Sequence, residues 1–314
     1  MVGVVSVIGS GPSGISAALE LAKDNSVLLI EQAGMLGGKL NELSCKGEIE
    51  CLECGVCSGL KLIDRVKKEK KIEIMLESKI VGVSFLESKA CLRIEQREQT
   101  VERLVDGIVL ATGHDIYKSN EETDRVISGA RFEREFRLGI AHDFEKGEKV
   151  AFVQCHGSRD RHFNYCSRVC CKHAARFAKR ATEKGASVTV FYLDLRDKKM
   201  REIENVRYIR AKIGEFVLDN NQVVVRYTSE NEEPCEDKYD RIILSTGLLP
   251  SSSNQALASM FRLELVDGFA ERSYAPLPIV TAGTLRGPMD IIESINSGYQ
   301  SAKELMSKMN AKRE

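Results

Sequence analysis

The chain has 314 residues, which is enough for one large domain or for two domains of ordinary size. Lys and Arg together number 46, as do Asp and Glu, so net charge gives no basis for binding nucleic acid or an anionic membrane surface. No apolar run approaches the roughly 18–20 residues of a membrane-spanning helix, and the N-terminal apolar run stops at Ile8 before glycines, which predicts a strand rather than a signal peptide.

A strand, a glycine-rich loop and a helix open the chain, and a second strand ends at Glu31. The loop reads Gly9-Ser10-Gly11-Pro12-Ser13-Gly14, and Glu31 lies 22 residues after Gly9. This is the context in which a GxGxxG motif predicts dinucleotide binding. Gly9 allows a tight turn, Gly11 lets the backbone approach a pyrophosphate, and Gly14 lets the helix pack on the strand. Free N–H groups at the helix start hold phosphates, and Glu31 accepts hydrogen bonds from ribose hydroxyls.

The remaining pattern alternates strands and helices, and part of it repeats. Buried strands 107–113 and 241–247 both end in a Thr-Gly turn, and a second strand–loop–helix–strand unit occupies residues 150–195. Further elements are expected at Leu60–Val66 (helix), Ile72–Ile74, Cys91–Ile94, Val206–Ile209, Val223–Tyr227 and Pro278–Gly283 (strands) and Ile291–Lys308 (helix), with a polar bridge over 116–147. The repetition predicts two similar halves in an α/β fold.

The second half has cysteines where the first has glycines. Four of the ten cysteines lie between the strand ending at Gln154 and the following helix, at Cys155, Cys166, Cys170 and Cys171. We expect a cytoplasmic protein, in which clustered cysteines point to metal or redox chemistry rather than structural disulfides. A helix beginning near Asn164 would place Cys166 and Cys170 on one face. Four converging thiolates suit a [4Fe–4S] cluster or tetrahedral zinc, and buried unliganded thiols are the alternative.

Charged side chains surround these thiols in the sequence. We expect them to tune the potential of a bound centre through charge and hydrogen bonds, with Arg161 and His162 belonging more simply to a solvated loop. The set comprises His156, His162, His173, Arg159, Arg161 and Arg168.

The order of the first-half motifs resembles the pyridine nucleotide–disulfide oxidoreductases, which implies FAD at the first site. The residues that match lie in the glycine loop and at four later points, namely Glu31, Gly37-Gly38-Lys39, Ala111-Thr112-Gly113 and Gly283. The family usually has an aspartate after that last glycine, and this chain has Thr284. Asp290 and Ile291 begin the final helix, where Asp290 either shares this contact or caps the helix.

The cysteine-rich half resembles HdrA, the flavin-binding subunit of heterodisulfide reductases. The matching motifs are Cys155-His-Gly-Ser-Arg-Asp160, Tyr165-Cys-Ser-Arg-Val-Cys-Cys171, Phe191-Tyr-Leu-Asp-Leu-Arg196, Glu53-Cys-Gly-Val-Cys57, Thr246-Gly247 and Gly287-Pro-Met-Asp-Ile291. The resemblance implies two Rossmann-like dinucleotide-binding domains, arranged as in thioredoxin reductases, with the second modified to hold an iron–sulfur cluster on Cys155, Cys166, Cys170 and Cys171. Residues 1–115 and 241–314 would form the FAD-binding domain, and 116–240 the inserted NAD(P)-domain-like module.

A first cysteine group precedes this loop, at Cys45, Cys51, Cys54 and Cys57. It follows Gly37-Gly38, the place where disulfide oxidoreductases keep redox-active cysteines against the flavin. Three interpretations compete. Cys51, Cys54 and Cys57, with Cys45, could ligate a second cluster. Cys54 and Cys57 could form a redox disulfide. The thiols could also face a partner without metal.

Taken together, these motifs predict an electron-transfer subunit. No general acid–base pair stands out, so no catalytic side chain is assigned and the cofactors are expected to do the chemistry. The resemblance implies FAD, a [4Fe–4S] cluster and other subunits of a heterodisulfide reductase-like complex in sulfur or disulfide metabolism, with a homodimer also possible. The ferredoxin-like CxxCxxC runs of larger members are absent from this sequence. The alternatives are an NAD(P)H-dependent disulfide reductase acting alone, a quinone-linked sulfate-reduction subunit, and a zinc-binding assembly protein.

Overall fold

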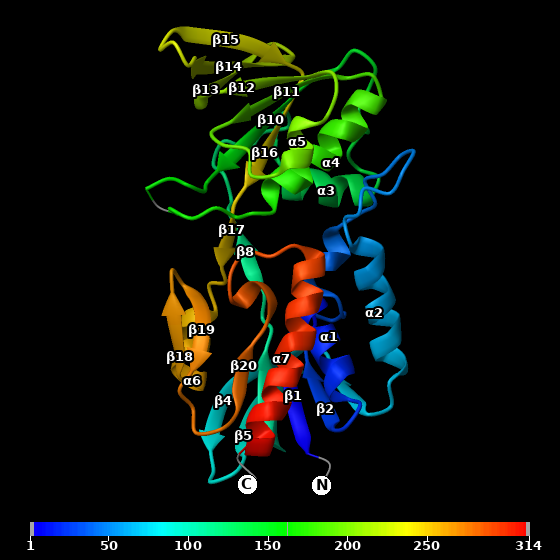
Figure 1. Ribbon diagram of the computed structural model, residues 1–314, viewed down its shortest axis with the longest axis vertical. Helices are drawn as coiled ribbons and strands as arrows, with labels where there is room; N and C mark the ends of the chain where they lie inside the picture. The colour runs from blue at the N-terminus through cyan, green and yellow to red at the C-terminus, as the bar shows by residue number, and fades with distance from the viewer. Residues whose placement is uncertain (1–2, 162, 312–314) are drawn as a thin grey trace. The chain divides into compact units, whose positions relative to one another are not determined.

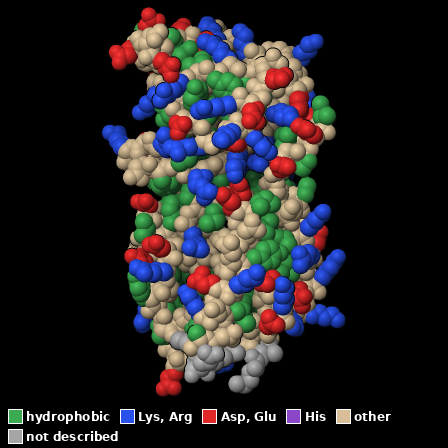
Figure 2. All heavy atoms as spheres, viewed as in Figure 1, with side chains coloured by type: hydrophobic (Ala, Val, Ile, Leu, Met, Phe, Trp, Pro, Cys, Tyr) green, Lys and Arg blue, Asp and Glu red, His purple; other side chains and the backbone are tan. Residues whose placement is uncertain are grey.

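The computed structural model describes residues 3–161 and 163–311, which form two compact units (Figure 1). The first unit comprises Met1–Asn41, Gly55–Asp115 and Pro250–Glu314, and the second comprises Glu42–Cys54 and Ile116–Leu249. Within the described ranges, no helix is both long and apolar enough to cross a bilayer. On the face shown in Figure 2, acidic and basic side chains are interspersed, as the equal totals of the two signs suggest.

A five-stranded parallel sheet forms the centre of the first unit. Its strands, in spatial order, are β20 (Ile279–Thr281), β7 (Gly107–Leu110), β1 (Val4–Ile8), β2 (Ser26–Ile30) and β3 (Ile72–Met75). These strands are nearly continuous apolar runs, which is typical of parallel strands covered on both faces. The helices are α1 (Pro12–Leu21), α2 (Val56–Lys68), α6 (Asn254–Phe261) and α7 (Ile291–Ala311), with short 3₁₀ turns η1 (Gly38–Glu42) and η2 (Gly283–Leu285).

Helices α1 and α7 cross at very short range. A Cβ on Gly298 of α7 would lie 2.1 Å from the carbonyl oxygen of Ser13, and the Ser16 hydroxyl donates to the Ile295 carbonyl oxygen at 2.9 Å. The unit is completed by an antiparallel sheet, β4 (Ser78–Phe85), β5 (Ala90–Gln96) and β6 (Gln99–Val105), and by the hairpin β18 (Leu263–Val266) and β19 (Phe269–Ser273).

The second unit repeats this plan. Its parallel sheet has the order β12 (Val206–Arg210), β11 (Ser187–Tyr192), β10 (Lys149–His156), β16 (Arg241–Thr246) and β9 (Val126–Ser128). An antiparallel sheet of β13 (Lys212–Asp219), β14 (Gln222–Thr228) and β15 (Pro234–Tyr239) precedes β16, just as β4–β6 precede β7. The helices are α3 (Gly129–Arg137), α4 (Cys170–Glu183) and α5 (Lys198–Arg201), and β8 (His114–Ile116) pairs with β17 (Leu248–Pro250) where the chain passes between the units. The prediction of two similar halves in an α/β fold is confirmed.

The unit limits differ from the expected ranges in two places. Strand β16 hydrogen-bonds in parallel register with β10 and β9, so the chain returns to the first unit after residue 249 and not at 241. Residues 116–147 are not a bridge, because β9 extends the second sheet and α3 buries Phe132 in its core. The many charged residues of α3 concealed its single buried face.

Candidate functional site

The glycine loop of the first unit has the geometry that a dinucleotide requires. Gly9 has φ +99°, and a Cβ there would lie 2.4 Å from the Ala111 carbonyl oxygen. A Cβ on Gly14 would lie 1.8 Å from the Gly9 carbonyl oxygen. At Gly11, by contrast, no atom lies within 4 Å of the Cβ position. Gly9 and Gly14 are therefore required by packing, whereas Gly11 leaves open backbone beside the first turn of α1, which begins at Pro12.

Glu31 is held rigidly at the carboxyl end of β2. It is 7% exposed, and one carboxylate oxygen accepts hydrogen bonds from the backbone N–H and the hydroxyl of Ser10, at 2.8 and 2.7 Å. The other oxygen accepts from the Ala33 N–H at 2.8 Å. A carboxylate has about four acceptor positions, so this one retains capacity for a ribose hydroxyl.

The other predicted dinucleotide residues meet the glycine loop at the carboxyl ends of the strands. The Gly37 N–H donates to the Ser10 carbonyl oxygen at 2.9 Å, and a Cβ on Gly38, the residue before Lys39, would lie 3.4 Å from the Cα of Gly11. A Cβ on Gly283 would lie 2.2 Å from the Ser13 hydroxyl oxygen. The Ala111 N–H donates to the Ile8 carbonyl oxygen at 2.8 Å, and the buried Thr112 hydroxyl has no hydrogen-bond partner. The carboxyl edge of a parallel sheet is the usual position of a nucleotide crevice.

His114 lies in this region, and the sequence reasoning missed it. Its Nδ1 is 2.9 Å from the hydroxyl oxygen of Thr284, the residue that stands where the resembling family has an aspartate. Burial lowers the pKa of His114 to about 4, and the nearby Lys39 cation acts in the same direction. The imidazole is therefore neutral at physiological pH. Its position directly after the Gly113 turn was the only signal in the sequence.

Asp290 caps helix α7, one of the two roles expected for it. One carboxylate oxygen of Asp290 accepts from the Glu293 N–H, and the Glu293 carboxylate accepts from the Asp290 N–H, both at 2.9 Å. This reciprocal pair is a capping box. Ile291 follows as the first residue of the helix.

The cysteine loop of the second unit departs from the helix expected at Asn164. Helix α4 begins at Cys170, so Cys166 lies in the preceding loop and not one turn earlier on a helix face. The reason is that residues 159–165 turn back on themselves, with the Arg159 N–H donating to the Tyr165 carbonyl oxygen at 3.2 Å. Cys155 has φ +60°, next to a register shift between β10 and β16. This bulge redirects the chain at the end of the strand.

The four loop thiols still lie within electrostatic range of one another. Burial raises the pKa of Cys155, and so would negative charge on Cys171 and Cys166. Cys170 donates a hydrogen bond to Cys171, which raises the pKa of Cys170 and lowers that of Cys171 to about 6. Among the described residues, no group of three or more His, Cys, Asp or Glu side chains is positioned to hold a metal ion. The thiols therefore fit a thiolate-bound centre in donor type and in proximity, while the final ligand geometry would have to form on binding. His162 lies outside the described residues.

The glycine of this loop does not offer open backbone. A Cβ on Gly157 would lie 2.3 Å from the ring of Tyr117. That ring is also held by edge contacts with His156 and Phe163, at centroid distances of 5.8 and 6.3 Å. The space that remains open above Gly11 in the first unit is thus filled by a side chain at the corresponding strand end of the second.

The first cysteine group is divided between the two units. Cys45, Cys51 and Cys54 belong to the segment 42–54 of the second unit, and Cys57 lies in the first turn of α2 in the first. Arg176 of α4 donates to the carbonyl oxygens of Leu52 and Glu53 at 2.9 and 3.1 Å. Cys45, Cys51 and Cys57 are exposed, and Cys54 is half-buried. The three interpretations of this group therefore stay open.

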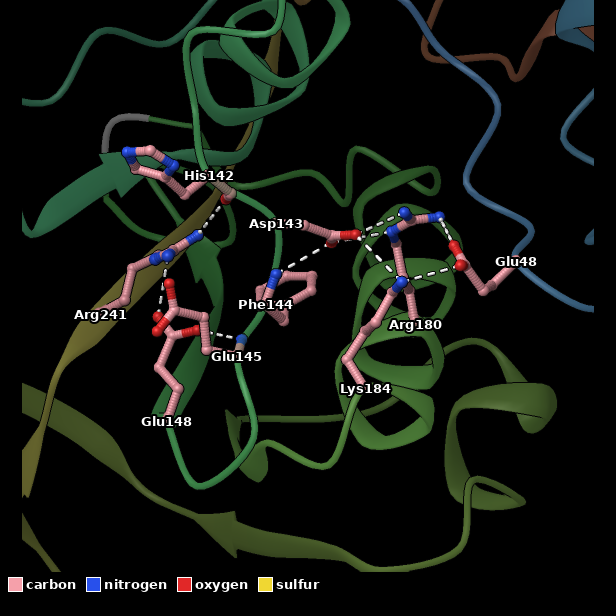
Figure 3. Close-up of polar contacts among 9 residues, drawn as sticks. All are labelled: Glu48, His142, Asp143, Phe144, Glu145, Glu148, Arg180, Lys184 and Arg241. Carbon is pink, nitrogen blue, oxygen red and sulfur yellow. Dashed lines mark hydrogen bonds and ion pairs between the residues drawn. The ribbon is translucent and has the colours of Figure 1, made fainter.

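Ion pairs fasten the same segment to α4 (Figure 3). Glu48 pairs with Arg180 at 2.8 Å and with Lys184 at 2.7 Å, and Arg180 is shared with Asp143 at 2.6 Å. Burial acts against ionisation of Asp143, but the hydrogen bond from Arg180 outweighs it and lowers the pKa of that carboxyl. The network holds a segment that has no helix or strand of its own beyond residue 42.

Glu133 anchors the same segment through a second set of contacts. Its carboxylate is fully buried and accepts from the Lys46 ammonium, from the Ser44 N–H at 3.0 Å and from Nε2 of His173 at 2.7 Å. Burial alone would raise the pKa of Glu133, but the hydrogen bond from His173 and the charges of His173 and Lys46 lower it to about 2. Glu133 thus joins the Cys45 segment to the helix that begins with Cys170.

Replacing Glu133 by Gln is expected to destabilise the second unit by about 3–5 kcal/mol, because the ammonium of Lys46, only 3% exposed, would lose its counter-charge. The pKa of Glu133 is below its usual value of 4.5, so its contribution is complete at neutral pH and is lost as pH falls toward 2. Urea unfolding at several pH values measures both effects. Glu53→Gln is the control, since its pair with Lys199 is exposed and is worth at most about 1 kcal/mol. Equal stability of the two variants would contradict the role of Glu133.

Comparisons with known proteins agree with this architecture. A family model for NAD(P)-binding Rossmann-like domains matches residues 7–55. The HdrA component of the H(2):CoB-CoM heterodisulfide,ferredoxin reductase of Methanothermobacter thermautotrophicus is 28% identical, over 73% of this chain and 40% of that protein. An HdrA-type iron–sulfur subunit of the CoB–CoM heterodisulfide reductase of Methanopyrus kandleri is 24% identical, over 94% of this chain and 63% of that protein. The chain therefore spans less than two thirds of the length of either relative.

Two solved structures show the same fold over nearly the whole chain. Thioredoxin reductase of Lactococcus lactis superposes with a TM-score of 0.68 at 20% identity, covering 98% of this chain and 99% of that one. Thioredoxin reductase of T. acidophilum gives a TM-score of 0.66 at 18% identity, covering 96% and 97%. The resemblance seen in the motifs is confirmed: the chain is a relative of heterodisulfide reductase HdrA, within the pyridine nucleotide–disulfide oxidoreductase-like flavoproteins.

Proposed function

We propose that the chain is an oxidoreductase subunit that binds FAD in its first unit and a [4Fe–4S] cluster in its second, and that it transfers electrons within a heterodisulfide reductase-like complex in sulfur or disulfide metabolism. The observation that carries the proposal is the contrast between the two strand-end loops. Gly11 has open space above its backbone, whereas the Cβ position of Gly157 is filled by Tyr117, and thiols follow. One half can accept a dinucleotide and the other has donors for a metal centre.

The residues of the first unit would bind and orient the flavin nucleotide. The N–H groups at the start of α1 face the pyrophosphate, Glu31 accepts from the ribose, and His114 with Thr284 presents a neutral polar pair beside Lys39. Cys155, Cys166, Cys170 and Cys171 would hold the cluster. Bound FAD exchanges electrons in pairs and an iron–sulfur cluster exchanges them singly, which is the chemistry a relay needs.

The partner proteins are inferred from the names of the relatives. Those relatives are each named as one subunit of a heterodisulfide reductase, so this chain would work with other subunits. The chief competing function is an NAD(P)H-dependent disulfide reductase acting alone. It requires a nicotinamide nucleotide site in the second unit, and the Tyr117 ring over Gly157 argues against one at that loop.

The test is anaerobic purification of the full chain, followed by flavin, iron and sulfide analysis and by EPR after reduction with dithionite. We expect FAD, iron and the EPR signal of a reduced cluster, and no rapid bleaching of the flavin by NADH or NADPH alone. The same sample bleached by dithionite is the control for an intact flavin.

Two results would overturn the proposal. Protein with neither flavin nor iron, or with zinc in place of iron, removes the relay. Rapid bleaching by NADH or NADPH would instead support the stand-alone reductase.

A further inference from the structure

Unpaired buried polar atoms concentrate at the cysteine loop. Nine buried side-chain nitrogen and oxygen atoms among the described residues have no hydrogen-bond partner, and four of them lie between Gln154 and Arg159. Buried polar groups in folded proteins are nearly always paired, so each exception calls for a cause. Four exceptions within six successive residues indicate a group that would bind there and satisfy them.

Gln154 is the most complete of these exceptions. It is 5% exposed, and neither its amide nitrogen nor its amide oxygen has a partner. Val150 and Phe152, two and four residues earlier on β10, pack in the same core cluster as Cys171. Because side chains alternate along a strand, Gln154 lies on the face covered by α4, at the end where Cys170 and Cys171 begin that helix.

Ser158 and Arg159 add donors on the other side of Cys155. Ser158 is 2% exposed, its hydroxyl is unpaired, and its N–H donates to the Cys155 carbonyl oxygen at 3.3 Å. The Arg159 side chain hydrogen-bonds the Cys155 thiol, while its Nη1 lies 3.7 Å from Asp194, outside hydrogen-bond range. Cys155, Gly157 and Arg159 all have positive φ, so the chain doubles back and keeps these donors beside the thiol.

The chemistry of the donors selects the type of group. An amide N–H, a hydroxyl and a guanidinium all donate hydrogen bonds, and the four cysteines supply thiolates. A phosphate would also accept such bonds, but Tyr117 occupies the position above Gly157. Thiolate and inorganic sulfide atoms accept hydrogen bonds, and such bonds are one of the main controls on the reduction potential of an iron–sulfur centre.

We propose that Gln154 and Ser158 donate hydrogen bonds to the sulfur atoms of the centre held by the loop cysteines, and so raise its reduction potential. This inference rests on the proposed function, since it requires the cluster. The two residues are positioning residues, and neither is a ligand. Their donors stabilise the reduced, more negative form of the centre over the oxidised form.

The experiment is an EPR-monitored redox titration of the anaerobically purified full chain with Gln154→Leu and, separately, Ser158→Ala. Each variant is expected to keep its iron and to lower the midpoint potential. A loss of about tenfold in the one-electron reduction equilibrium corresponds to about 59 mV. Thr189→Val is the matched control, because Thr189 is a buried polar residue of the same sheet, on β11, away from the loop.

The outcomes separate this inference from the proposed function. Variants that hold wild-type iron and titrate at the wild-type potential, as the Thr189→Val control should, would overturn the role of Gln154 and Ser158 and leave the cluster in place. Wild-type protein without iron would overturn both. If Gln154→Leu loses its iron, Ser158→Ala decides: a lowered potential supports the inference, and an unchanged one rejects it.

Discussion

A Gly11→Leu variant is expected to fold like the wild type and to lose its FAD. Gly11 precedes α1 with φ −67° and ψ −179°, which any residue adopts, and the position of its Cβ is free of other atoms within 4 Å. A leucine side chain would therefore enter the space proposed for the pyrophosphate without disturbing the protein. Flavin content and thermal unfolding of the purified variant measure the two effects separately.

Gly14→Ala is the informative companion to this variant. Its Cβ would lie 1.8 Å from the Gly9 carbonyl oxygen, so α1 must move away from β1 and the unit is expected to lose several kcal/mol of stability, about 3 or more. FAD would then be lost together with the fold. If Gly11→Leu retained a full complement of FAD, the nucleotide would not lie over this loop.

The sequence was most informative where a local pattern determines the structure. Gly9, Gly11 and Gly14 between an apolar strand and an amphipathic helix predicted the first loop, and the structure shows a separate packing reason for Gly9 and Gly14. The repeated strand ending in Thr-Gly predicted the two halves, because the residues of β7 and β16 are almost all apolar in both. Each of these features lies within a few residues of the chain.

Features that depend on distant residues could not be predicted in the same way. The side chain of Tyr117 fills the space over Gly157 from a segment 40 residues earlier in the chain, which no local pattern reveals. Glu133 looks like one more charge in the polar sequence of α3, yet it is the buried partner of Lys46 and His173. The start of α4 was misplaced because the turn over residues 159–165 uses backbone groups that a helix would need.

The segment 42–54 shows the same limit. Its place after Gly37-Gly38 suggested thiols against a flavin, whereas its contacts with Arg176 and Arg180 assign Cys45, Cys51 and Cys54 to the second unit. The acidic residues Glu48, Glu50 and Glu53 that make these contacts are regularly spaced, but their basic partners lie more than a hundred residues later. Only the folded chain pairs them.

The second large effect is expected at the loop cysteines. Cys166→Ser and Cys170→Ser should each lose most of the bound iron, because a [4Fe–4S] cluster held by four thiolates loses a ligand in either case. Both variants should retain FAD, since the glycine loop belongs to the first unit. Cys51→Ser and Cys54→Ser are the matched controls, and they should leave the iron on the loop cysteines in place.

Iron and flavin content of these four variants beside the wild type, all purified anaerobically as full chains, is the most direct test of the relay. The account predicts about four iron atoms and about one FAD per chain in the wild type, with the EPR signal of the reduced cluster absent from Cys166→Ser and Cys170→Ser and FAD unchanged. Full iron in Cys166→Ser and Cys170→Ser, with iron lost only from Cys51→Ser and Cys54→Ser, would contradict the assignment of the cluster to the loop of the second unit.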